Sequence, residues 1–356
     1  MARQSQTPHI TIVNYGQLFR MGFFVIAIDL LTRHGDLTSL HAGWNHQGPI
    51  QGGNMKAGLR GVVFVFVVFL CSVSATWAQD LGPGFTKVKD GIYVYAAKDG
   101  NSTCSVVLTE EGPVIIDTCQ TPPDAHRLLA AVKKLTDKPI RFVIDTEVHS
   151  DHTFDHFVFS PPGIVINHQG AGDGMRKNTD PKRVETLIAQ SPEMKEAVKD
   201  YRMVTPHIEY KDRMTIHLGE RTFELIYLKN VHSEADEAVW LPKERVLFAA
   251  SAANVRTIIN LRPFVRIQDV LASYKLMKSL NPEIVVPGHG AVSTTKIFDE
   301  YEGFYTLLLK RVTDMARQGK SLEEIKKELK MPEYADWAGQ DRLGVNIDVA
   351  YASMAK

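Results

Sequence analysis

The histidines of this chain recur directly after short apolar runs, and this placement limits the possible folds more than any other feature. Two histidines and two carboxylates lie within Glu147–His152, just after the apolar run Phe142–Ile144. His232 follows the strand-like run Phe223–Tyr227, and His289 follows another short apolar run. Rigid scaffolds present functional residues on loops of this kind. We therefore expect a fold that brings three strand ends together, with side chains that suit zinc, iron or manganese.

These motifs resemble those of the metallo-β-lactamase fold superfamily of metallohydrolases, and the resemblance covers roughly residues 85 to 350. That family carries a His-x-His-x-Asp-His loop, a later single His and a final His in a Gly-His-Gly turn. Glu147–His152 matches the loop at every ligand position except the first, and His232 and His289 match the later histidines. Ala238–Phe248 resembles the hairpin of the family, and Ser251 stands where many members have a metal-bridging aspartate.

The resemblance implies two metal sites. It assigns Glu147, His149 and His232 to the first, and Asp151, His152 and His289 to the second. We expect one or two Zn²⁺ ions, and the carboxylate at Glu147 also admits Fe or Mn. A carboxylate gained at Glu147 offsets the one missing at Ser251, so two ions would still face two carboxylates. The alternative is that Glu147 abolishes the first site and a single metal binds.

Further residues are candidates for supporting roles. The resemblance makes Asp151 the catalytic residue, which ligates metal and orients the attacking hydroxide. Candidate hydrogen-bond partners of the ligating imidazoles, chosen by proximity in sequence, are Thr146, Ser233 and Asp236. His156 lies four residues after His152, so we expect it to support the site, with completion of the first site as the alternative.

The implied chemistry is metal-assisted hydrolysis of a small ester, lactam, lactone or sulfate ester. The chain has no Gly-x-Ser-x-Gly elbow and no Gly-x-Gly-x-x-Gly or Walker-type loop, so a serine nucleophile and nucleotide binding are unsupported. The formal net charge is +0, which gives no support to a nucleic-acid partner. The alternatives are a mononuclear or iron-dependent enzyme that handles thiol esters or sulfur, and a binding protein that lost its chemistry. The sequence makes no prediction of oligomeric state.

The N-terminal region predicts export. Residues 55–78 have the basic start, apolar run and small-residue end of a signal peptide, cleaved before Gln79. Residues 1–54 then form an upstream extension that is no domain. The alternative is a retained anchor, although the apolar run is short for a membrane span. We expect the mature protein to be periplasmic or secreted, without stable membrane association after cleavage. These compartments are oxidising, so Cys104 and Cys119 either form a disulfide or remain buried thiols.

The resemblance implies that residues 79–356 form one hydrolase domain of the α/β class, an αββα sandwich of two facing mixed β-sheets flanked by helices, with a C-terminal helical tail. Strands are expected at Ile92–Tyr95, Cys104–Leu108, Val114–Asp117, Phe142–Ile144, Ile164–Ile166, Met214–Leu218, Thr222–Tyr227, Ala238–Leu241 and Val246–Phe248. Helices are expected near Pro123–Leu135, Ile267–Leu280 and Ile297–Gln318, and after a capping box at Ser321.

The family resemblance predicts that residues 170–206 form a helical lid over the site. Among Arg256, Arg262 and Arg266, Arg262 is the candidate for binding an anionic group, and at least two of the three are expected to be surface residues.

Overall fold

A computed structural model of the chain describes residues 80–98 and 100–354. The predicted signal peptide (55–78) and upstream extension (1–54) lie outside the described residues. Among the helices described, each is too short or too polar to cross a lipid bilayer.

Two β-sheets form the centre of the domain. The larger sheet has the strand order β1-β2-β3-β4-β5-β6-β7, with β1 Phe85–Lys89, β2 Ile92–Tyr95, β3 Cys104–Val107, β4 Val114–Ile116, β5 Phe142–Ile144, β6 Ile164–His168 and β7 Ile208–Tyr210. The smaller sheet has the order β12-β11-β10-β9-β8, with β8 Arg213–Leu218, β9 Arg221–Tyr227, β10 Glu237–Leu241, β11 Val246–Phe248 and β12 Ile284–Val286. Both sheets are mixed, because β4 to β7 pair in parallel, as do β11 and β12, while their other neighbours are antiparallel.

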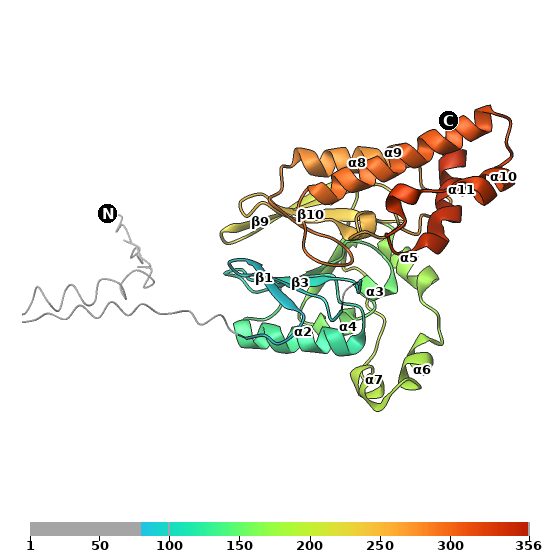
Figure 1. The fold of residues 1–356 in the computed structure, drawn as a ribbon. Coiled ribbons are helices and arrows are strands. Elements are labelled where there is room, and N and C mark those ends of the chain that lie inside the picture. Colours follow the sequence, from blue (N-terminus) through green and yellow to red (C-terminus); the bar gives the residue numbers. More distant parts are fainter. Residues whose placement is uncertain (1–79, 99, 355–356) are drawn as a thin grey trace, which may run out of the picture. The chain divides into compact units, whose positions relative to one another are not determined.

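Helices flank the two sheets (Figure 1). They are α2 Pro122–Leu135, α3 Ser150–Thr153, α4 His156–Phe159, α5 Ala171–Asn178, α6 Arg183–Ile188, α7 Pro192–Ala197, α8 Ile267–Ser279, α9 Lys296–Arg317, α10 Leu322–Glu328 and α11 Leu343–Met354. In Figure 1, α2 lies below the larger sheet, whereas α8 and α9 lie above the smaller one. Helix α10 begins with the predicted capping box, in which Ser321 and Glu324 bond each other's backbone N–H groups.

Alternating side chains on each strand build two cores, as strand geometry requires. On β3 and β4, Val106 and Ile115 point into the core between the larger sheet and α2. Their neighbours Val107 and Val114 point into the core between the two sheets, where they meet side chains such as Phe223. A third core packs the smaller sheet against α8 and α9. The predicted αββα sandwich is therefore confirmed.

Three strands were absent from the expected list. Strand β12 of the smaller sheet was expected only as a short apolar run before His289, and the other two lie at the margins of the larger sheet. β1 and β7 are its edge strands, and most of their residues remain partly or fully exposed. An exposed edge strand needs no apolar pattern, and this is why periodicity did not reveal either one.

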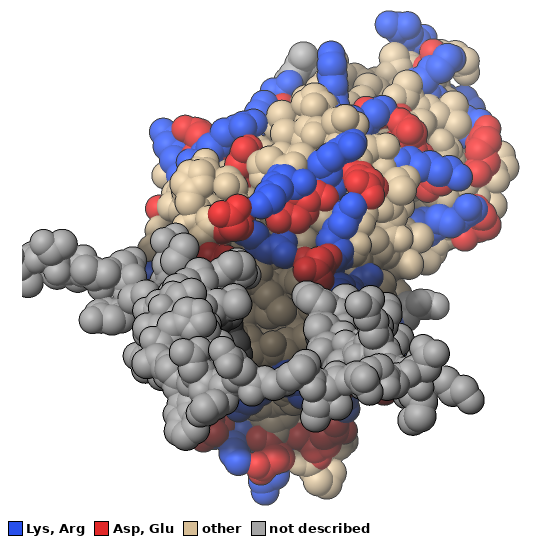
Figure 2. All heavy atoms as spheres, turned by 90° about the vertical axis from the view of Figure 1, so that its left-hand side faces the viewer, with Lys and Arg blue, Asp and Glu red and all other residues tan. Residues whose placement is uncertain are grey.

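The surface carries charges of both signs. On the face shown in Figure 2, Lys and Arg side chains are interspersed with Asp and Glu side chains. This distribution agrees with the formal net charge of +0, and this face offers no broad basic surface of the kind that binds nucleic acid.

Candidate metal centre

Six side chains from strand-end loops converge in two groups of three. Triad 1 consists of Glu147, His149 and His232, and triad 2 consists of Asp151, His152 and His289. Glu147 and His149 follow β5, Asp151 and His152 lie in α3, His232 follows β9, and His289 follows β12. The structure thus brings together the residues that the sequence analysis assigned to each metal.

The spacing of the donor atoms suits a divalent ion. In triad 2, His289 Nε2 lies 3.4 Å from His152 Nε2 and 3.4 Å from Asp151 Oδ2. In triad 1, His232 Nε2 lies 3.7 Å from Glu147 Oε2. Ligands held tetrahedrally at about 2.0–2.2 Å from zinc are roughly 3.3–3.6 Å apart. The two His289 distances in triad 2 fall in this range, whereas in triad 1 the His232–Glu147 distance is slightly longer and His149 contacts Glu147 directly. In each triad the three donor atoms lie within 4.8 Å of one another.

Glu147 faces both triads. Its Oε2 contacts His149 Nδ1 within triad 1, and its Oε1 lies 3.2 Å from His152 Nε2 of triad 2. Ser251, the residue at the usual bridging position, is buried and places its Oγ 3.4 Å from the same His152 nitrogen. The Glu147 carboxylate and the Ser251 hydroxyl therefore face the same imidazole nitrogen.

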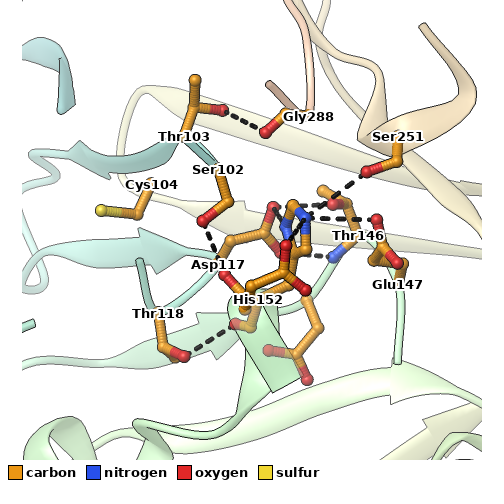
Figure 3. Close-up of polar contacts among 12 residues, drawn as sticks. Ser102, Thr103, Cys104, Asp117, Thr118, Thr146, Glu147, His152, Ser251 and Gly288 are labelled. Atoms are coloured by element: carbon orange, nitrogen blue, oxygen red, sulfur yellow. Dashed lines mark hydrogen bonds and ion pairs between the residues drawn. The ribbon is translucent and has the colours of Figure 1, made fainter. Parts of the chain in front are cut away.

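Asp117 supports His152 and was missed by the sequence analysis. Its Oδ2 accepts the Thr146 hydroxyl at 2.7 Å and lies 3.0 Å from His152 Nδ1, while its Oδ1 accepts the Thr146 backbone N–H at 2.7 Å. A carboxylate on the outer nitrogen of a ligating imidazole fixes the tautomer and the ring orientation. Figure 3 shows the side chains of Asp117, Thr146 and His152 close together, joined by these contacts. The sequence signal was the end of a buried strand, the same signal that identified His289.

The partners proposed for the imidazoles were wrong in detail. Asp236 accepts backbone N–H groups of residues 231–233 and the Ser233 hydroxyl, so it shapes the loop that carries His232 without touching the ring. The ring of His289 contacts the Gly100 carbonyl at 3.1 Å. Proximity in sequence was a poor guide here. Asp236 binds the backbone of its own loop, whereas the rings of His152 and His289 are contacted by Asp117 and Gly100, which lie far away in the sequence.

His156 belongs to a separate buried pair. Its Nε2 lies 2.7 Å from Asp145 Oδ1, and its Nδ1 lies 2.8 Å from the Val204 carbonyl. Both ring nitrogens are therefore engaged, and His156 does not complete triad 1. Asn167 links this pair to the centre, because its amide donates to Asp145 at 3.0 Å and to the Glu147 carbonyl at 3.3 Å.

Burial and charge shift the pKa values of the centre in both directions. Burial opposes protonation of His152, but the charges of Glu147 and Asp117 raise its pKa well above the ordinary value. Burial lowers the pKa of His232 to about 4, although the Glu147 charge opposes this shift. Burial opposes ionisation of Glu147, but the charges of His152 and His232 hold its pKa well below its ordinary value. Burial raises the pKa of Asp236 to about 7, and the Glu147 charge adds to that shift. Triad 1 therefore presents an ionised carboxylate and a neutral imidazole.

A cavity of about 650 Å³ opens onto both triads. Its lining beyond the triads is polar or small: Gly100, Ser150, Asn254, Thr257, Asn260, Arg262, Ala338, Gly339 and Arg342. Arg262 Nη2 lies 3.0 Å from His149 Nε2, and Arg342 donates to the Ile258 carbonyl at 3.2 Å. The cavity therefore presents two guanidinium groups, and no large apolar side chain is among its lining residues.

The three arginines considered in the sequence analysis differ in location. Arg256 pairs with Asp336 and Arg266 with Asp269, and both arginines are about half exposed. Arg262 alone among them lines the cavity.

The predicted lid lies elsewhere. No residue of 170–206 is among the lining residues of this cavity. This segment does contain helices, but Leu187 and Val198 pack against Phe154 and Phe157 behind the α3–α4 segment. The lid prediction was therefore wrong, because the segment buries its apolar side chains on the outside of the metal loop.

The C-terminal segment supplies the wall expected from that lid. Ala338 exchanges backbone hydrogen bonds with the 256–258 loop, donating to the Arg256 carbonyl and accepting from the Ile258 N–H. Gly339 has φ +72°, and a Cβ there would lie 2.9 Å from the Ile258 carbonyl, so the close approach requires glycine. Arg342 follows within the same turn of chain.

Comparison with known proteins agrees with this geometry. The family model described as the metallo-beta-lactamase superfamily matches residues 97–289, which include both triads. The chain belongs to this superfamily. Members of the superfamily usually bind divalent metals, and membership supports an enzyme of hydrolase type that acts on a small molecule.

Individual relatives are distant. The chain is 22% identical over 198 residues to the 2,4-dinitroanisole O-demethylase subunit alpha of Nocardioides sp. (strain JS1661), covering 55% of each protein. It is 23% identical over 215 residues to a linear primary-alkylsulfatase of Pseudomonas sp. (strain ATCC 19151), covering 51% of this chain and 40% of that protein. The structure of the stereoselective inverting sec-alkylsulfatase Pisa1 from Pseudomonas sp. is similar in fold, with TM-score 0.60 and 16% identity over 75% of this chain and 49% of that one. The chain spans about half the length of the relatives it matches.

Proposed function

We propose that this protein is an exported hydrolase that uses two divalent metal ions, zinc foremost, to cleave a small anionic ester. The observation that carries the proposal is the convergence of two donor triads on a cavity that also presents two arginines. When bound, such ions lower the pKa of a coordinated water and polarise the electrophile.

The protein residues divide the remaining work. Glu147, His149 and His232 would hold one ion, and Asp151, His152 and His289 the other. Asp151 is the carboxylate that lines the cavity, so it is placed to orient the attacking water as well as to bind metal. Glu147, which faces both triads, would supply the negative charge that Ser251 cannot.

Arg262 and Arg342 favour a substrate with an anionic group. A guanidinium binds carboxylate and sulfate oxygens in a fixed, forked geometry. Sulfate esters are the first candidates, because two similar proteins are named as alkylsulfatases. The polar lining favours a short or polar alcohol over a long alkyl chain, since apolar ligands are normally bound by apolar walls.

The experiment is a metal titration of the full-length chain followed by a substrate panel. Two equivalents of Zn²⁺ and turnover of a short-chain or aryl sulfate ester would support the proposal. The panel includes an uncharged ester, a lactone, a β-lactam and 2,4-dinitroanisole, and faster turnover of an uncharged compound would contradict the role given to the arginines. Arg342→Gln should raise KM for the anionic substrate about tenfold with little change in kcat, and leave the uncharged ester unaffected.

Export is proposed from the N-terminal sequence and supported by the cysteines. Cys104 and Cys119 form a disulfide, and disulfides persist mainly outside the cytosol. N-terminal sequencing of the natural protein tests this proposal. A mature start at Gln79 supports cleavage and export, and an intact N-terminus would contradict them.

A further inference from the structure

The Cys104–Cys119 disulfide joins the two segments of chain that hold triad 2. Cys104 begins β3, and Cys119 lies in the loop after β4. Both residues are buried. Figure 3 shows Cys104 beside the polar contacts that surround His152.

On the Cys104 side, the two preceding residues bind the loops of Asp151 and His289. The Ser102 hydroxyl donates to the Asp151 carbonyl at 2.7 Å. The Thr103 N–H donates to the Gly288 carbonyl at 2.8 Å, directly before His289 in sequence. Displacement of this segment would therefore move two of the three residues of triad 2.

On the Cys119 side, the two preceding residues bind His152. The N–H and the hydroxyl of Thr118 both donate to the His152 carbonyl at 2.7 Å, and Asp117 lies against the ring at 3.0 Å. Each member of triad 2, or the residue next to it, thus contacts a residue that lies within two positions of a disulfide cysteine.

The backbone around Cys119 needs external restraint. Asp117 has φ 56° and Cys119 has φ 74°, so two residues without glycine's freedom lie in the left-handed region on either side of Thr118. Such conformations cost free energy and persist only where the surroundings fix them. The disulfide is a covalent restraint at one end of this strained turn.

Triad 1 is supported differently. Asn167 holds the Glu147 backbone, Arg262 contacts the His149 ring, and Asp236 holds the loop of His232. Thr146, next to Glu147, connects triad 1 to the disulfide segments through two hydrogen bonds to Asp117.

We propose that the Cys104–Cys119 disulfide is a positioning element for the second metal site, so that reducing it weakens metal binding by Asp151, His152 and His289 while sparing Glu147, His149 and His232. This inference rests on the proposed metal binding of the two triads. Its consequence is a redox-dependent metal centre, complete when the protein is oxidised.

The test is stepwise Zn²⁺ binding by the full-length chain, measured by chelator competition and by native mass spectrometry. The double variant Cys104→Ala/Cys119→Ala should weaken one of two equivalents by tenfold or more and leave the other unchanged. Wild-type protein reduced with a phosphine should behave in the same way, and reoxidation should restore it. Adding His232→Ala to the double variant should weaken the remaining equivalent, which assigns that equivalent to triad 1, because His232 belongs to triad 1 alone.

Val312→Ala, a cavity variant in α9, controls for general loss of stability and should retain both equivalents. Two equivalents of unchanged affinity in the double variant would overturn the inference while leaving the proposed function intact. Equal weakening of both equivalents in the double variant, matched by Val312→Ala, would show a nonspecific effect of stability and would also overturn it. Wild-type protein that binds no metal would overturn the proposed function together with this inference.

Discussion

Asp117→Asn separates the role of a supporting carboxylate in metal binding from its role in stability. The substitution keeps the shape of the side chain but removes its charge and one of its two acceptor oxygens. Asp117 is buried and receives two bonds from Thr146 besides its contact with His152. In the variant, at least one of these three contacts is lost, or its donor and acceptor roles are exchanged. A hydrogen bond to a charged group contributes about 1.5–3 kcal/mol, so we expect the free energy of unfolding to fall by about 2 kcal/mol.

The effect on the metal should be separable from this loss. Removing the partner of a ligating histidine typically weakens metal binding ten- to a hundredfold, or about 1.4–2.7 kcal/mol. We expect one of two Zn²⁺ equivalents to weaken by this factor. The assay is competition with a chromophoric chelator, alongside urea unfolding of the metal-free protein.

Asp145→Asn is the matched control. Asp145 is also fully buried and lies 2.7 Å from an imidazole, that of His156, which belongs to neither triad. It should lose a similar amount of stability and retain both equivalents within about threefold. Equal metal affinities in the two variants would refute the assignment of Asp117 as the support of a ligand.

Three further predictions concern charge and metal. Glu147→Gln should reduce the bound Zn²⁺ from two equivalents to one, as measured by mass spectrometry, and two retained equivalents would exclude Glu147 as a ligand. Glu237 is fully buried, and burial raises the pKa of its carboxyl well above its ordinary value of 4.5. The carboxyl therefore keeps its proton in the folded protein. The stability that protonated Glu237 contributes is complete below about pH 4.5 and is lost as the pH rises toward the pKa of the folded state. Glu237→Gln should therefore lose less stability than wild type between pH 4.5 and 8 in urea unfolding, and identical pH profiles would contradict this. Chelation of the loaded protein should lower Tm, and added Zn²⁺ should restore it; an unchanged Tm in calorimetry would argue against metal in the folded protein.

Local patterns in the sequence revealed the candidate ligands, and the family resemblance that those patterns carry predicted the sandwich and the grouping of the ligands. Glu147, His149, Asp151 and His152 are close in sequence, and each later histidine follows its own apolar strand. These features are set by short stretches of chain, in which side-chain period and strand ends can be read directly.

The residues that were missed depend on long-range contacts. Asp117 meets His152 across 35 positions, and Arg342 reaches the cavity through a loop 84 positions earlier in the chain. Neither lies in a motif. Their roles arise from parallel pairing of β4 with β5 and from docking of the C-terminal segment, which a pattern of apolar residues does not specify.

The cavity wall at Ala338–Arg342 lies beyond residue 289, where the family match ends. The residues proposed to perform the chemistry and part of the surface that selects the substrate therefore occupy separate stretches of the chain. Exchange of the C-terminal stretch between relatives could change substrate preference while every candidate ligand stays in place. The same arrangement makes the site a late product of synthesis, because a nascent chain that already carries both triads still lacks one side of its binding cavity.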